Sequence, residues 1–202
     1  MTTTVHILIL AAGASSRMRG ADKLLQPVRR RPLLAHVARI AIATGSPVLV
    51  TLPPDAPARD AALRGLPVHR VPVPDADQGM SRSLVRGIDA LQGSAGPQDG
   101  LMILPADMPE FSTAALSDLI ARFRDEPDLI YRGGTVEGQP GHPAIFPRDL
   151  WPALQRVTGD EGGRSVLRQN QGRVRVIPLP GPMAILDLDT PEDWAAWRAG
   201  DR

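Results

Sequence analysis

The segment LILAAGASSRMRGADKLL, residues 8–25, combines the end of a buried strand with a loop of small residues. Val5–Leu10 is an uninterrupted apolar run, which is typical of a strand that is covered on both faces. The loop after it has little side-chain bulk, and two cations, Arg17 and Lys23, stand toward its far end. Ligands of open α/β sheets bind beyond the carboxyl ends of the strands, so this segment predicts both a fold class and the position of a site.

Strand and helix patterns alternate along most of the chain, with a long glycine-rich loop after residue 132. Besides Val5–Leu10, strands are predicted at 47–52, 68–71, 101–104, 128–131, 144–146 and 174–177, and helices at 32–40, 56–64, 81–91, 113–124, 148–157, 162–169 and after Thr190. Such alternation predicts an α/β protein with three layers, α/β/α, in which helices cover both faces of a mostly parallel sheet.

The composition excludes several classes of function. The 202 residues carry a net charge of +1, which gives no broad attraction to nucleic acid or to an anionic membrane, and no apolar run is long enough to span a bilayer. Cysteine is absent, so disulfides, thiolate catalysis and cysteine zinc sites are excluded. We expect a cytoplasmic protein that binds neither nucleic acid nor membranes, and a single domain over residues 1–202.

The first loop has the chemistry of a phosphate-binding site. Its backbone N–H groups are almost uncovered, Arg17 can fork across two phosphate oxygens, and Lys23, the only lysine of the chain, can meet a third as a compact charge. The predicted nucleotide-binding residues here are Leu10, Ala11, Ala12, Gly13, Ala14, Ser15 and Lys23. The GxxxxGK[ST] and GxGxxG patterns are both missing, and an ordinary strand-to-helix turn with exposed cations is the alternative.

The residues LAAGASSRM followed by DKLL resemble the signature of the molybdopterin-type nucleotidyltransferases, and most closely that of the molybdenum cofactor cytidylyltransferases. The guanylyltransferase relatives usually carry Leu-Ala-Gly-Gly, so Ala12 favours CTP. Arg19 stands where the family usually has glycine, which is a departure. The resemblance implies a Rossmann-like nucleotidyltransferase fold with a mostly parallel mixed sheet, and catalytic roles for Arg17 and Lys23.

Two acidic segments are candidates for a Mg²⁺ site. LMILPADMPE places Asp107 directly after a strand, and magnesium prefers one or two carboxylates together with phosphate and water. In LDLDTPEDW, Asp187 and Asp189 point the same way on an extended chain, and the residues after them match a helix start. Both segments resemble family motifs, which implies Asp107 and Asp187 as metal ligands, with Asp189 as the alternative to Asp187. Helix capping or solvated aspartates would also explain the pattern.

Three shorter segments resemble further family motifs. DQGMSRSLVRGI implies a nucleotide contact at Gly79, Met80 and Ser81, where the first amides of a helix can accept an anion or a base edge, although Ser81 as a simple N-cap is an equal alternative. Two other segments imply acceptor-binding residues, and these are Gly141, His142 and Arg164. A turn between two helices is the competing interpretation for the segment that precedes Arg164.

Together the motifs imply a nucleotidyltransferase that moves CMP from CTP onto the phosphate of molybdopterin and releases pyrophosphate. Residues 1–110 would bind the nucleotide and 111–202 the acceptor. Mg²⁺ is the expected cofactor, CTP is the favoured triphosphate, and a molybdoenzyme or its chaperone is considered as a protein partner. The alternatives are a sugar-1-phosphate or small phospho-alcohol nucleotidyltransferase, a GTP-using molybdopterin guanylyltransferase, and a nucleotide-binding regulatory module without turnover.

Overall fold

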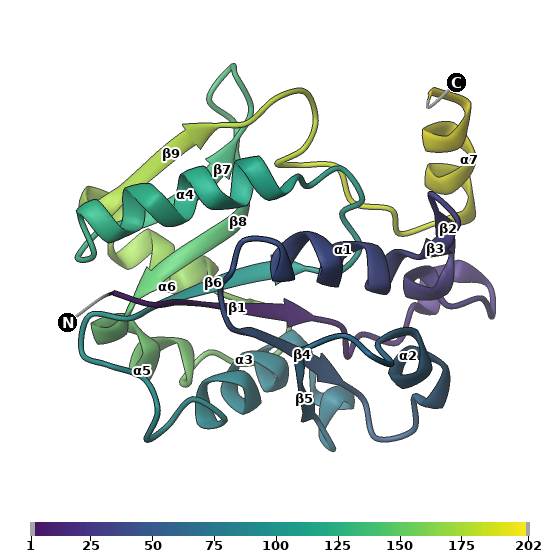
Figure 1. Ribbon diagram of the computed structural model, residues 1–202, viewed down its shortest axis with the longest axis horizontal. Coiled ribbons are helices and arrows are strands. Elements are labelled where there is room, and N and C mark those ends of the chain that lie inside the picture. The colour runs from purple at the N-terminus through teal and green to yellow at the C-terminus, as the bar shows by residue number, and fades with distance from the viewer. Residues whose placement is uncertain (1–2, 201–202) are drawn as a thin grey trace.

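The computed structural model describes residues 3–200, and a seven-stranded sheet with helices on both faces forms its centre (Figure 1). The strands lie in the order β5-β4-β1-β6-β8-β7-β9. Their bounds are β1 Val5–Leu10, β4 Val48–Leu52, β5 His69–Pro72, β6 Gly100–Pro105, β7 Ile130–Gly134, β8 Pro140–Pro147 and β9 Val174–Pro178. Strand β8 is antiparallel to β6 and β7, and the other neighbours are parallel. The predicted α/β/α fold with a mostly parallel mixed sheet is confirmed.

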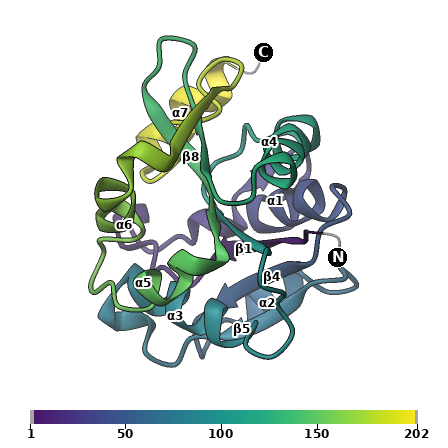
Figure 2. The ribbon, with the colours of Figure 1, turned by 90° about the vertical axis from the view of Figure 1, so that its left-hand side faces the viewer.

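The helices form two layers that can be followed in Figure 2, where α1 and α4 cover one face of the sheet and α3, α5 and α6 cover the other. Their bounds are α1 Leu33–Ile42, α2 Pro57–Ala62, α3 Met80–Asp89, α4 Thr113–Asp125, α5 Trp151–Leu154, α6 Arg164–Gln169 and α7 Pro191–Gly200. Within residues 3–200, none of these helices combines the length and the apolar character that crossing a bilayer needs.

The alternation of side chains along the central strands creates two cores. Ile7 and Ile9 of β1 pack with α1 and α4, whereas Leu8 between them packs with α3. All three are fully buried, as expected for a strand that is covered on both faces. With each face of β1 filled by a helix layer, its loop is held at the carboxyl edge of the sheet.

Two predicted elements after residue 132 are corrected by the structure. Strand β8 runs over Pro140–Pro147 and is not confined to 144–146, because its first residue pairs with Gly134 of β7 although glycine and proline dominate that stretch. The helix predicted at 148–157 is shorter: a 3₁₀ turn, Arg148–Leu150, leads into α5, which ends at Leu154.

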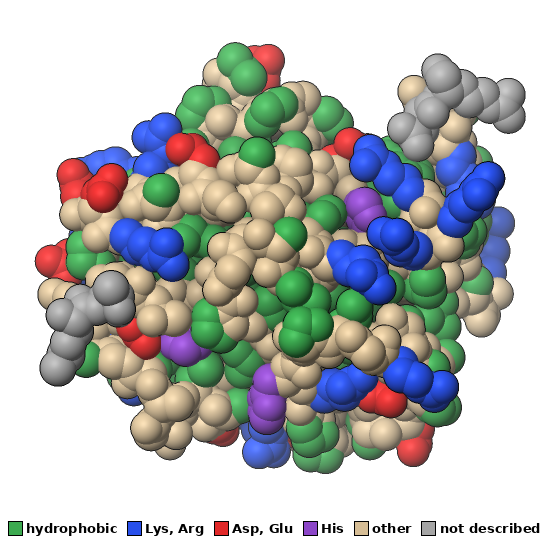
Figure 3. All heavy atoms as spheres, in the orientation of Figure 1, with side chains coloured by type: hydrophobic (Ala, Val, Ile, Leu, Met, Phe, Trp, Pro, Cys, Tyr) green, Lys and Arg blue, Asp and Glu red, His purple; other side chains and the backbone are tan. Residues whose placement is uncertain are grey.

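A small hairpin, β2 Pro27–Val28 and β3 Arg31–Pro32, was not expected from the sequence. Its two turn residues, Arg29 and Arg30, have φ values of 46° and 65°, a conformation that usually selects glycine or asparagine. Arginine at these positions hides the hairpin signal from sequence patterns. In Figure 3, Lys and Arg side chains gather on the side where Figure 1 places this hairpin and α7.

Asp99 ties the amino-terminal end of β1 to the turn before β6. Its carboxylate accepts hydrogen bonds from the N–H groups of Thr4 (3.0 Å) and Gly96 (2.8 Å), and His6 Nε2 lies 3.1 Å from Asp99 Oδ2. Burial opposes ionisation of Asp99, but these contacts outweigh it and lower the pKa of its carboxyl group.

We predict that Asp99→Ala lowers the free energy of unfolding by about 1–3 kcal/mol at pH 7, because buried donors lose their acceptor. The folded-state pKa of Asp99 is lower than its unfolded value, so the contribution is complete above the ordinary carboxyl pKa and is lost as the pH falls through the folded value. Urea unfolding of both proteins at pH 7 and pH 3 measures this difference. A gap that is equally wide at both pH values would contradict the prediction.

Candidate functional site

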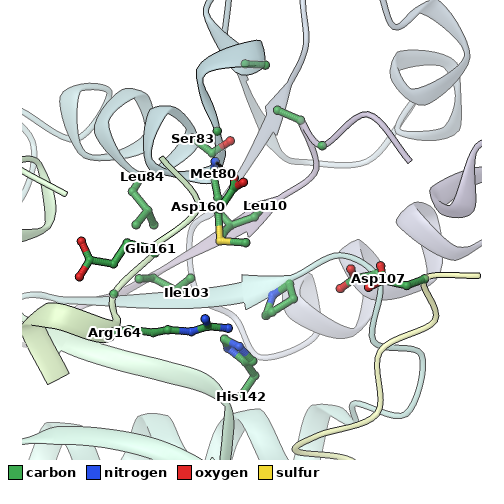
Figure 4. Close-up of a pocket in the computed structure, with 18 of the residues that line it drawn as sticks. Leu10, Met80, Ser83, Leu84, Ile103, Asp107, His142, Asp160, Glu161 and Arg164 are labelled. Carbon is green, nitrogen blue, oxygen red and sulfur yellow. Dashed lines mark hydrogen bonds between the residues drawn. The ribbon is translucent and has the colours of Figure 1, made fainter. Parts of the chain in front are cut away.

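A cavity of about 770 Å³ opens at the carboxyl ends of β1 and β6, where the topology places ligand sites (Figure 4). Most of the predicted site residues line it: Leu10, Ala12, Gly13, Ala14, Ser15, Arg17, Lys23, Gly79, Met80, Asp107, His142 and Arg164. Four do not line it: Ala11, Ser81, Gly141 and Asp187. Segments from both ends of the chain therefore meet in one cavity, and the four remaining residues lie behind or beside its wall.

The loop after β1 presents a run of backbone donors. Ala11 donates its N–H to Thr51 Oγ1 at 3.1 Å, so this amide is not available to a ligand. Among residues 3–200, no hydrogen-bond acceptor is found for the N–H groups of Ala12, Gly13 and Ala14. Ala12, Gly13 and Ala14 line the cavity with little side-chain cover, so their amides are available to an anion, and the anion-binding role of the loop stays a prediction.

Lys23 lies between two carboxylates that come from distant parts of the chain. Its Nζ is 2.5 Å from Asp107 Oδ2 and 2.6 Å from Asp189 Oδ1, and Arg17 Nη2 is 2.6 Å from the other oxygen of Asp189. Burial alone would lower the pKa of Lys23, but the two carboxylates outweigh it and raise that pKa. The ammonium is therefore charged, and Lys23 and Arg17 are both ion-paired before any ligand binds.

The two candidate carboxylates near the C-terminus are placed differently. Asp189 lines the cavity and pairs with Lys23 and Arg17, whereas Asp187 is exposed beside it. Burial and the charges of Asp189 and Asp107 raise the pKa of Asp187, so three acidic groups influence one another here.

The carboxylates at Lys23 fit a divalent cation that is shared with phosphate. Asp107 and Asp189 already converge on one cationic centre, the ammonium of Lys23. In the described chain, residues 3–200, no three His, Cys, Asp or Glu side chains gather in a geometry that could hold a metal ion. This donor set suits magnesium, which takes one or two carboxylates and completes its shell with phosphate and water.

The first amides of α3 already have hydrogen-bond partners within the protein. Met80 N donates to Asp160 Oδ1 and Ser81 N to Gly159 O, both at 2.9 Å, so the loop before α6 already occupies the first amides of the helix. Gly79 has a φ of 104°, and a Cβ there would lie 2.6 Å from the Gly159 carbonyl carbon. This contact explains the glycine. The side chain of Met80, 47% exposed, faces the cavity in place of the amides.

The wall opposite the loop is cationic. Arg132 donates from Nε and Nη2 to Gly141 O at 3.0 and 2.8 Å, and the Arg164 guanidinium lies beside His142 in Figure 4. Desolvation of the His142 ring, with a further contribution from Arg132, lowers its pKa to about 4, so the imidazole is neutral at pH 7. Two guanidinium groups and a neutral donor or acceptor form a wall that suits a second anion.

Gly141 lies behind this wall and supports it. A Cβ at Gly141 would overlap the carbonyl oxygen of Ala184, and the next residue, His142, donates its N–H to that same oxygen at 2.7 Å. The glycine therefore allows a close backbone approach that holds His142 toward the cavity.

Several residues that line the cavity were not predicted from the sequence, and the charged side chains of Arg132, Asp160 and Glu161 are among them. Arg132 was hidden because it lies within a strand and before a glycine-rich stretch, and Asp160 and Glu161 were hidden because their segment resembles a turn. The signal for Arg132 was its position near the end of a strand.

Between the polar walls, Leu10, Leu84 and Ile103 give an apolar surface that can accept a flat ring.

Comparison with known families and proteins gives matches over nearly the whole chain. The model of the MobA-like NTP transferase domain matches residues 7–174. Two relatives are each 28% identical to the chain. "Nicotine blue oxidoreductase" of Paenarthrobacter nicotinovorans is aligned over 92% of both chains, and "Probable molybdenum cofactor guanylyltransferase" of Nostoc sp. over 93% of this chain and 87% of the relative.

Solved structures agree with the fold. Rv0371c of Mycobacterium tuberculosis H37Rv matches with a TM-score of 0.82 at 27% identity, over 96% of this chain and 98% of that one. The same protein in complex with manganese matches with a TM-score of 0.78 at 26% identity, over 96% and 97%.

The neutral state of His142 gives a direct prediction. By NMR, its imidazole should titrate near pH 4, and Arg132→Gln should raise this pKa because it removes a neighbouring positive charge. His69, an exposed histidine on β5, serves as the internal control, because its imidazole signals at pH 7 should coincide in the two proteins. A His142 pKa near the ordinary value in the wild type would contradict the desolvated geometry.

Proposed function

The chain belongs to the MobA-like NTP transferase family, and from this premise we propose that it moves a nucleoside monophosphate from a triphosphate onto the phosphate of molybdopterin, with CTP as the favoured donor. The observation that carries the proposal is the position of Lys23, Arg17 and two carboxylates beside the unoccupied amides of the first loop. This set can hold a polyphosphate and the cation that accompanies it.

The first loop would bind the triphosphate. The amides of Ala12, Gly13 and Ala14 would donate to its oxygens, while Lys23 and Arg17 leave their carboxylate partners to pair with phosphate. The same groups would stabilise the charge that spreads over the transferred phosphoryl group. The reaction needs this help, because two unit charges about 4 Å apart repel by about 4 kcal/mol at an effective dielectric near 20.

The sequence favoured Asp107 and Asp187 as metal ligands, with Asp189 as the alternative. We propose Asp107 and Asp189 instead, because Asp189 lines the cavity, and Asp187 becomes the alternative second ligand. A bound Mg²⁺ would supply positive charge against the departing pyrophosphate. Support comes from the convergence of both carboxylates on Lys23, and from the manganese complex of Rv0371c, a relative at 26% identity.

The cationic wall would bind the acceptor. Arg132, His142 and Arg164 of this wall would hold the acceptor phosphate. They would direct one of its oxygens toward the α-phosphorus of the nucleotide. A phosphate nucleophile is already ionised at pH 7, so no general base is required. The division into a nucleotide half, 1–110, and an acceptor half, 111–202, is part of the same proposal.

The choice of nucleotide has two candidates. Ala12 favours CTP by its resemblance to the cytidylyltransferase signature, whereas the printed name of the Nostoc relative favours GTP. The test is pyrophosphate release with Mg²⁺, each triphosphate in turn, and molybdopterin or a sugar phosphate as acceptor. Release with CTP and molybdopterin supports the proposal, and release with GTP alone assigns the guanylyl activity. Nucleotide binding without release for any acceptor would favour the regulatory module.

We predict that Lys23→Arg lowers kcat by about 100- to 1,000-fold. A planar guanidinium cannot occupy the compact position of the ammonium between Asp107 and Asp189, and it cannot move from there to pair with the phosphate as the ammonium would. Arg122→Lys on α4 is the matched control and should keep wild-type rates, because within residues 3–200 this arginine pairs only with the exposed Asp118. Steady-state pyrophosphate release measures both. A wild-type rate for Lys23→Arg would show that any cation suffices.

A further inference from the structure

Arg59 is a buried arginine of α2 whose side chain enters the first loop from outside the cavity. Only 5% of its surface is exposed, and it is absent from the cavity lining. All its hydrogen bonds go to the segment that follows β1. They run from Nη1 to Ala11 O (2.7 Å) and Gly13 O (2.8 Å), from Nη2 to Ser15 Oγ (3.2 Å) and Asp22 Oδ1 (3.0 Å), and from Nε to Asp22 Oδ2 (2.6 Å).

The two bonds to backbone carbonyls set the direction of two amides. In a planar trans peptide the C=O and the following N–H point in opposite directions. Holding Ala11 O and Gly13 O toward Arg59 therefore turns the N–H groups of Ala12 and Ala14 away from Arg59. These are amides of the proposed phosphate cradle, and both residues line the cavity.

The bonds to Asp22 connect the same guanidinium to Lys23. Asp22 Oδ1 also accepts a hydrogen bond from Leu24 N at 2.9 Å, and this bond caps the start of the short 3₁₀ turn Lys23–Leu25. Ser15 Oγ accepts from Lys23 N at 3.3 Å, so the hydroxyl held by Arg59 touches the same turn. The Arg59 side chain thereby holds both the backbone of the cradle and the backbone of the turn that carries Lys23.

We propose that Arg59 is the positioning residue of the phosphate site: it does not touch the triphosphate but orients the Ala12 and Ala14 amides and the Lys23 turn for it. This inference rests on the proposed function. The planar guanidinium is required because its fork reaches two carbonyls, a hydroxyl and a carboxylate at once, and an ammonium cannot satisfy all four. The Asp22 carboxylate neutralises its charge, so Arg59 acts through geometry.

The test uses Arg59→Lys in the full chain, with inorganic tripolyphosphate and CTP, each in the presence of Mg²⁺, as probes and calorimetry as the readout. We expect a loss of about tenfold or more in affinity for each cradle amide that is misdirected. In the wild type, tripolyphosphate should shift the NMR signals of the Ala12 and Ala14 amides, and in Arg59→Lys these shifts should be much smaller. The KM for the triphosphate should rise with the loss of affinity.

Arg70→Lys is the matched control, because it makes the same substitution at another partly buried arginine. Arg70 is a half-buried arginine of β5 that also pairs with a carboxylate, Asp60, and donates to a carbonyl, Leu63 O, but has no contact with the first loop. It reports how far such a substitution lowers thermal stability and, through stability, affinity.

Asp22→Asn is the second variant if Arg59→Lys does not fold. It keeps the size of the side chain and weakens the hydrogen bonds that Arg59 donates to residue 22.

The outcomes separate the two proposals. Wild-type affinity and wild-type amide shifts in Arg59→Lys would overturn the positioning role while the proposed function stands. An affinity loss that Arg70→Lys reproduces would also overturn it, because general destabilisation would then explain the effect. Failure of the wild type itself to bind tripolyphosphate, CTP and GTP alike in the presence of Mg²⁺ would overturn the proposed function together with the role of Arg59.

Discussion

The ammonium of Lys23 is the contact on which the site depends, because it joins three segments that are far apart in the sequence. Its partners are Asp107, which follows β6, and Asp189, which precedes α7. A charge that is largely removed from water must be paired, and the geometry of the pairing fixes all three segments at one edge of the sheet. Arg17 extends the chain of ion pairs to the rim, where its side chain is 69% exposed.

The reversed direction of β8 decides where the opposite wall lies. Parallel strands present their carboxyl ends at one edge, and an antiparallel strand among them begins at that edge. Strand β8 therefore starts, with Gly141 and His142, beside the ends of β6 and β7. This is how a segment that looks like an irregular glycine-rich loop becomes a rigid support for His142, with Arg132 bonded to its backbone.

The sequence predicted the parts of the fold that rest on local chemistry. The apolar run of β1, the N-cap at Ser112, whose Oγ accepts from Ala115 N, and the start of α7 at Thr190 were all found as expected. The motif residues of the cavity were mostly identified by family resemblance. Arg59 and Arg132 were missed because the chain has 23 lysines and arginines and the partners of these two lie on other elements. The position of Arg132 near a strand end was its one local signal, and Arg59 had none.

The paired resting state of the cations has a consequence for what the empty protein attracts. Lys23 and Arg17 are already neutralised, so a stray inorganic phosphate gains little by approaching them, and a lone divalent ion must displace an ammonium from Asp107 and Asp189. Only a ligand that brings an anion and a metal ion together offers new partners to the two cations and the two carboxylates in one step. Under the proposed function, these ion pairs would therefore disfavour binding of the metal or the anion alone without any steric filter.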